Sequence, residues 1–140
     1  MSPNPEGRTA KCGRVQAQTR LQHAKKFYEV AELVALEGAD IPASSSVAAA
    51  LAVLAGIAAS DAACCIAMGR RSRGQDHRQA VTLVQQVSPG GTGAARNLGR
   101  LLDIKDTAHY GVIPVSGPEL KAALRHTQAL VEFAEACLRR

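Results

Sequence analysis

The chain has 140 residues, of which 46% are hydrophobic, 21% are charged and only 3% are aromatic. This length suits a single domain that can bury a core without metals or a disulfide framework. The absence of Trp and the scarcity of other aromatic residues predict an aliphatic, Ala-rich core of closely packed helices, and they argue against an aromatic base-stacking surface. The net charge of +5 is compatible with a polyanionic partner.

The N-terminal residues 1–13 are polar and contain two prolines, so we expect a disordered tail there, followed by one helical domain over residues 14–140. The tail lacks the apolar run of a secretory signal, and the Ala-rich stretch 47–59 is short for a membrane span. We therefore expect a cytoplasmic protein that does not enter the membrane. The four cysteines form no CxxC pair, so we expect reduced thiols and no metal site.

Apolar residues at helical spacing predict five helices with short connections, and hence an all-α, up-and-down antiparallel bundle. The first helix covers about 14–37 and ends near Gly38. The second has N-cap candidates at Ser44–Ser46 and ends at Gly69. Its alanines and Gly56 would let neighbouring helices approach closely, so we expect it at the centre of the bundle.

Three shorter segments complete the predicted fold. Asp76 is an N-cap candidate for a third helix, with His77 at its first position, and that helix ends before Pro89. A fourth helix covers about 93–109. Ser116 and Glu119 then form a capping-box pattern that predicts the start of a fifth helix, which continues to about residue 138.

The connector between the second and third helices concentrates cationic side chains. Arg70, Arg71, Arg73 and Arg78 lie within nine positions and surround His77. Guanidinium groups bind phosphate oxygens through two parallel hydrogen bonds, and a helix N-terminus favours an anion. A histidine can exchange a proton with the 2′-hydroxyl or the leaving oxygen of RNA near neutral pH. The turn therefore predicts an RNA- or nucleotide-binding site, although such a loop can also be simply solvated.

Two other segments could support this site. Asp61 lies in an otherwise apolar helix, and if it is buried it needs a partner. It could orient His77 or an arginine of the basic turn, pair structurally with Lys105 or Tyr110, or be exposed. Lys105 could widen a phosphate-binding surface, or its stem could cover apolar surface. We expect Tyr110 to pack at a helix end with its hydroxyl bonded.

The sequence over 56–81, GIAASDAACCIAMGRRSRGQDHRQAV, and the later segment 101–111, LLDIKDTAHYG, resemble a group of small actinobacterial HEPN-domain proteins. The resemblance covers residues 20–138. It implies an all-α, often dimeric bundle, and its active members are metal-independent ribonucleases with an Arg and a His separated by four to six residues. Arg70 and Arg71 both fit that spacing to His77. Arg70 directly follows the helix-ending Gly69 and is favoured for that reason, whereas Ser72 after Arg71 better matches the family's small polar residue.

The resemblance leads to two functional hypotheses. The first is a cofactor-free endoribonuclease, as in the toxin of a toxin–antitoxin pair, with Arg70 or Arg71 and His77 catalytic and with Arg73, Arg78 and Lys105 binding substrate. In this hypothesis Asp61, Asp76 and Tyr110 support the site, and two protomers bring their motifs together. The second is a non-catalytic helical module that binds a nucleotide or a protein partner, such as the nucleotidyltransferase that the resemblance implies.

Overall fold

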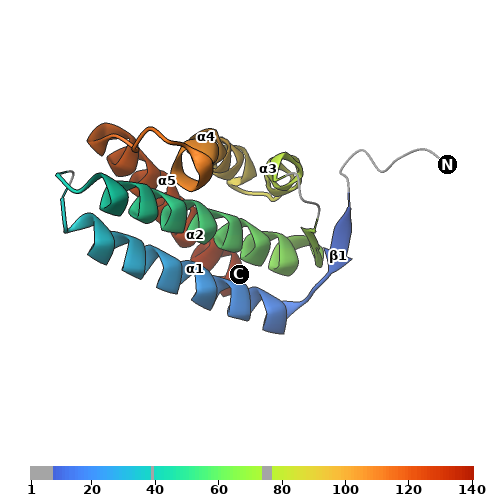
Figure 1. Ribbon diagram of the computed structural model, residues 1–140. Helices are drawn as coiled ribbons and strands as arrows, with labels where there is room; N and C mark the ends of the chain where they lie inside the picture. Colours follow the sequence, from blue (N-terminus) through green and yellow to red (C-terminus); the bar gives the residue numbers. More distant parts are fainter. Residues whose placement is uncertain (1–7, 39, 74–76) are drawn as a thin grey trace.

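A computed structural model describes residues 8–38, 40–73 and 77–140. Over these residues the chain forms an all-α helical bundle of five helices with a small two-stranded sheet at one end (Figure 1). In chain order the elements are β1 (Thr9–Lys11), α1 (Arg14–Ala35), α2 (Pro42–Met68), β2 (Arg70–Ser72), α3 (Arg78–Gln85), α4 (Gly91–Tyr110) and α5 (Gly117–Arg139).

Helix α2 is the central element of the bundle, as predicted. It packs against α1, α3, α4 and α5, and its buried residues surround the helix rather than forming one stripe. Gly56 is buried and has no room for a side chain, because a Cβ atom there would lie 2.4 Å from Leu101 Cδ1 on α4 and 3.2 Å from Leu130 Cδ1 on α5. The small side chains of α2 therefore set how closely the other helices approach.

The apolar character of α2 also meets the length and hydropathy criteria for a membrane span, with a mean hydropathy of 2.0 over its most apolar 18-residue window. However, 67% of that window is buried within the bundle. The central helix of a helical bundle passes the same test, so hydropathy alone does not indicate a span here.

Helix α2 begins earlier than predicted. Its N-cap is Ile41, and Pro42 occupies the first helical position. The missing N–H of a proline costs no hydrogen bond there, because an N–H at this position has no partner within the helix. Ser44 and Ser45 are consequently buried inside the first turn instead of capping it, and the Ser44 hydroxyl donates to the Glu37 carboxylate. The Ser116–Glu119 capping box of α5 is confirmed.

The prediction of a disordered tail is wrong for the part of it that the structure describes. Residues 9–11 form β1, which pairs antiparallel with β2, and Lys11 lies opposite Arg70. The pairing brings Cys12 next to the last turn of α2, where it forms a disulfide with Cys65 (Cα–Cα 5.2 Å). The expectation of four reduced thiols is therefore wrong for this pair, whereas Cys64 and Cys137 are free and buried.

Candidate anion-binding site

Strand β2 carries the first two arginines of the basic turn and directs them to different hollows. Helix α2 ends at Met68, its C-cap Gly69 has a φ of 70° in the left-handed region, and the chain then enters β2 in an extended conformation. Side chains alternate between the two faces of a strand. Arg70 accordingly lines a hollow shared with β1 and the start of α1, whereas Arg71 lines a different one near α3.

The hollow that contains Arg71 is the candidate site. It has a volume of about 250 Å³. Ile57 and Ala80 supply its apolar wall. Its polar residues come from α1, α2, β2 and the turn before α3: Arg20, Asp61, Arg71, Ser72, Arg73 and His77.

An ion pair between α1 and α2 forms one wall of this hollow. Arg20 Nη2 lies 2.9 Å from Asp61 Oδ2, and Arg20 Nε lies 3.2 Å from the same oxygen. The Asp61 side chain is only 8% exposed and that of Arg20 is 29% exposed. The carboxylate that needed a partner therefore finds it on α1, and the predicted structural pairing of Asp61 with Lys105 or Tyr110 is wrong.

Burial and nearby positive charge shift the pKa of Asp61 in opposite directions. Burial raises the pKa of its carboxyl group above the ordinary value, while the charge and hydrogen bonds of Arg20, and then the charge of Arg71, lower it again. The net pKa remains raised. Arg71 is thus close enough to interact electrostatically with Asp61, which links the basic turn to the buried ion pair.

A second, smaller hollow of about 180 Å³ adjoins the first through His77, which lines both. It also contains Arg78 and Lys105, so α3 and α4 bring Lys105 to the histidine, as the substrate-binding hypothesis requires. Arg78 forms an exposed ion pair with Asp103, with 2.8 Å between Nη2 and Oδ1. His77 itself directly precedes α3, which begins at Arg78.

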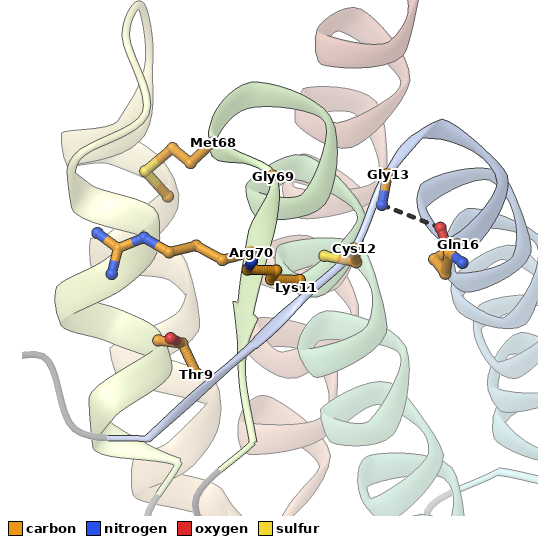
Figure 2. A pocket seen from close by; sticks show the side chains of 8 residues that line it. All are labelled: Thr9, Lys11, Cys12, Gly13, Gln16, Met68, Gly69 and Arg70. Atoms are coloured by element: carbon orange, nitrogen blue, oxygen red, sulfur yellow. Dashed lines mark hydrogen bonds between the residues drawn. The ribbon is translucent and has the colours of Figure 1, made fainter.

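Other predicted site residues lie elsewhere. Arg70 is not among the residues that line either hollow containing His77; its side chain extends from β2 in the same direction as those of Met68 and Thr9 (Figure 2). Tyr110 is 78% exposed at the end of α4 and contacts only the ring of His109 among the described aromatic pairs, so its predicted packing is wrong. Asp76 lies outside the described residues.

Sequence reasoning missed Arg20 as a member of this site. Arg20 is one polar residue among several on α1, and nothing in its local sequence distinguishes it. The signal that could have found it is on the partner, because a buried carboxylate in an Ala-rich helix demands a cation from a neighbouring helix.

Comparisons of this chain with known protein families, with curated proteins and with solved structures find no match.

The chemistry available in the hollow follows from its charges. The lining contains three arginines, Arg20, Arg71 and Arg73, and one carboxylate, that of Asp61, so it carries a net positive charge. The pairing of Arg20 with Asp61 leaves Arg71 and Arg73 as the cations best placed to meet an incoming anion. His77 adds a group that can accept or donate a proton near neutral pH.

Proposed function

We propose that this chain is a HEPN-type, metal-independent endoribonuclease that binds an RNA phosphodiester in the hollow between β2 and α3. The observation that carries the proposal is that Arg71 and His77, which have the family's spacing in the sequence, line one hollow together with the Arg20–Asp61 ion pair. Between the two candidate arginines, this observation favours Arg71.

In the proposed reaction, the nucleophile is the 2′-hydroxyl of the RNA's own ribose. His77 accepts the proton of the 2′-hydroxyl as that oxygen attacks phosphorus, and Arg71 and Arg73 stabilise the negative charge that develops on the phosphate oxygens. The P–O5′ bond breaks, which leaves a 2′,3′-cyclic phosphate and a 5′-hydroxyl end. Asp61 does not touch the substrate in this scheme; paired with Arg20, it attracts and orients Arg71.

Cleavage also needs a proton donor for the leaving oxygen. The hollow of one chain contains one histidine, His77, which already serves as the base. We therefore propose a homodimer in which two such hollows face each other and the two His77 side chains share the acid and base roles. Lys105 and Arg78 in the adjoining hollow would extend the cationic surface along the RNA. A cytoplasmic location and an antitoxin partner form part of the same proposal.

The test is incubation of the purified protein with a short RNA in EDTA, followed by analysis of the product ends. The proposal expects 2′,3′-cyclic phosphate ends from the wild-type protein and none from His77→Ala. His109→Ala is the matched control, because His109 is an exposed histidine on α4 that bonds to the Lys105 carbonyl oxygen and lines neither hollow. Wild-type protein without cleavage activity, or cleavage that survives His77→Ala, would contradict the proposal.

A different observation favours a non-catalytic binding module as the second candidate. A hollow of about 650 Å³ between the end of α1 and the start of α5 is lined by Leu33, Leu36, Leu120 and Leu124, and its charged lining residues are Glu29, Glu32 and Lys121. Leu36 is 81% exposed. This combination fits an amphipathic helix of a protein partner, such as a nucleotidyltransferase, that presents leucines flanked by Lys or Arg.

This second candidate is tested with a synthetic helical peptide of that pattern. Binding that Leu36→Glu abolishes and Val15→Glu leaves unchanged would support it, because Val15 is a comparably exposed apolar residue near the opposite end of α1. Undetectable binding of the peptide, or equal binding by both variants, would contradict it.

A further inference from the structure

The short strand β1 supports the backbone of the segment that lines the candidate site. Thr9, Ala10 and Lys11 pair with Ser72, Arg71 and Arg70, respectively. The Cys12 N–H donates to the Gly69 carbonyl oxygen at 3.0 Å, and the Arg73 N–H donates to the Arg8 carbonyl oxygen at 3.0 Å. The segment that contributes Arg71, Ser72 and Arg73 to the hollow is therefore supported along its whole length by residues 8–12.

Backbone pairing alone is a weak attachment for β1. The sheet has only two strands of three residues each, and such a small sheet is marginal in water. Apart from the backbone, which continues through Gly13 into α1, the Cys12–Cys65 disulfide is the covalent link between this segment and the bundle among the described residues. The disulfide thus reinforces the pairing of β1 with β2, and reduction can remove this reinforcement.

The two cysteines of this disulfide differ in their exposure to solvent. Cys65 is 1% exposed. Cys12 is partly exposed and lines a hollow of about 720 Å³ at the junction of β1, β2 and α1, together with Lys11 and Arg70 (Figure 2). A thiolate can therefore reach Cys12, and the two cationic side chains favour one that carries negative charge.

The neighbouring free thiol does not compete for this bond. Cys64 precedes Cys65 on α2, but burial, with a smaller effect of the Asp61 charge, raises its pKa to about 12. It stays protonated near neutral pH, and a protonated thiol is a poor nucleophile. Cys64 is thus a poor nucleophile for exchange with this disulfide, and Cys12 is the more exposed cysteine of the pair.

We propose that Cys12 is a thiol-exchange site for anionic low-molecular-weight thiols, and that exchange there releases β1 and loosens the hollow formed by Arg71, Arg73 and His77. The thiolate RS⁻ attacks Cys12 Sγ, the RS–Sγ bond forms, the Sγ–Sγ bond breaks, and the electron pair goes to Cys65 Sγ, which takes a proton from water. A second thiolate then attacks the mixed disulfide and releases RSSR and the Cys12 thiolate. Two thiols are oxidised and one protein disulfide is reduced.

The exchange step is tested without RNA, by intact-mass and peptide mapping after acid quenching. Glutathione, which is anionic, and cysteamine, which is cationic, are compared at equal thiolate concentration. The proposal expects the first adduct on Cys12 and a rate about three- to tenfold higher for glutathione. The rate difference should shrink in Lys11→Gln and persist in Lys25→Gln, an exposed control on α1. A first adduct on Cys65 would overturn the assignment of Cys12, and equal rates for both thiols with wild-type protein would overturn the preference for anionic thiols.

The loosening step is tested by amide hydrogen exchange of the oxidised protein, the mildly reduced protein and Cys12→Ser. The amides at position 12 and at Arg73 should exchange at least about tenfold faster without the disulfide, whereas α5 amides should keep their rates. Unchanged exchange at Arg73 would overturn this step. Because reduced wild-type protein is measured as well, the result does not depend on the folding of the variant.

The regulatory consequence rests on the proposed RNA-binding function, and its failure is distinguishable from failure of that function. If the oxidised protein binds a short RNA at least about fivefold more tightly than the reduced protein, the consequence is supported. Equal binding by both forms, with the exchange of Arg73 altered, would overturn the regulation alone. No RNA binding by either form would overturn the proposed function and the regulation together, while the assignment of Cys12 is decided by the mass data.

Discussion

Arg70 and Arg71 are neighbours on β2 but line different hollows, because side chains alternate along a strand. Arg71 shares its hollow with His77 and with the Arg20–Asp61 pair, whereas Arg70 shares its hollow with Cys12 and Lys11. The two residues have the same chemistry and nearly the same position in the sequence. They are therefore a matched pair for separating the two hollows experimentally.

We expect Arg71→Ala to weaken the binding of a short RNA by at least about tenfold, since hydrogen bonds to charged groups contribute ~1.5–3 kcal/mol. Arg70→Ala should weaken it by less than about threefold, through the loss of general positive charge. Fluorescence anisotropy at one fixed salt concentration measures both effects. Equal losses, or a larger loss for Arg70→Ala, would show that the phosphate does not bind in the hollow lined by Arg71.

The Arg20–Asp61 pair should contribute to stability as well as to the site. Arg20→Ala leaves a nearly buried carboxylate without its cation, and breaking a fully buried pair in this way costs about 3–5 kcal/mol. Because the Arg20 side chain is 29% exposed, water screens part of this effect, and we expect about 1–3 kcal/mol in urea unfolding. Lys26→Ala is the control: its pair with Glu29 is largely exposed and should contribute less than about 1 kcal/mol. Similar losses for the two variants would show that the pair is not effectively buried.

The raised pKa of Asp61 predicts how stability depends on pH. A carboxyl group whose pKa is higher in the folded than in the unfolded state binds more protons when folded, so its contribution to stability is largest at low pH. That contribution declines as pH rises from about 4, the ordinary carboxyl value, through the raised value. The measurement is the free energy of unfolding of wild type minus that of Asp61→Asn, followed with pH. We expect this difference to fall as pH rises through that window; a difference that increases would mean that Arg20 and Arg71 outweigh burial.

The packing of α2 gives a prediction that does not involve the site. Gly56→Val adds atoms where a Cβ would already lie 2.4 Å from Leu101 Cδ1, and overpacking of a tight core costs about 1–3 kcal/mol. We expect a loss of this size in thermal or urea unfolding. Gly99→Val is the control, because Gly99 also lies within a helix, α4, but a Cβ atom added there would meet no neighbouring heavy atom within 4 Å. If Gly56→Val is no more destabilising than Gly99→Val, the close approach of α2 and α4 is wrong.

The fold could be predicted from local patterns because the spacing of apolar residues and the capping residues report directly on helices. Gly69 and Ser116 mark helix ends that the structure confirms. The start of α2 could not be placed this way, since Pro42 is equally compatible with a break and with the first turn of a helix. Strand β1 is not predictable because three residues carry no periodicity, and its conformation depends on pairing with residues about sixty positions away.

The sequence indicated part of the composition of the candidate site, namely Asp61, Arg71, Arg73 and His77, but not its geometry. Sequence spacing allowed either Arg70 or Arg71 to accompany His77, and only the alternation along β2 separates them. Arg20 and the Cys12–Cys65 disulfide both arise from contacts between distant segments, with sequence separations of 41 and 53 between the partners. Such contacts are set by how helices pack, and a single sequence does not report them.

The most direct test of the account is a double-mutant cycle on RNA cleavage, with Arg71→Ala, His77→Ala and the double variant measured under single-turnover conditions. Residues that act on one phosphate as a unit have strongly non-additive effects. We predict that the double variant loses little more activity than the more damaging single variant. Losses that multiply independently would contradict the claim that Arg71 and His77 act together on one substrate in one hollow.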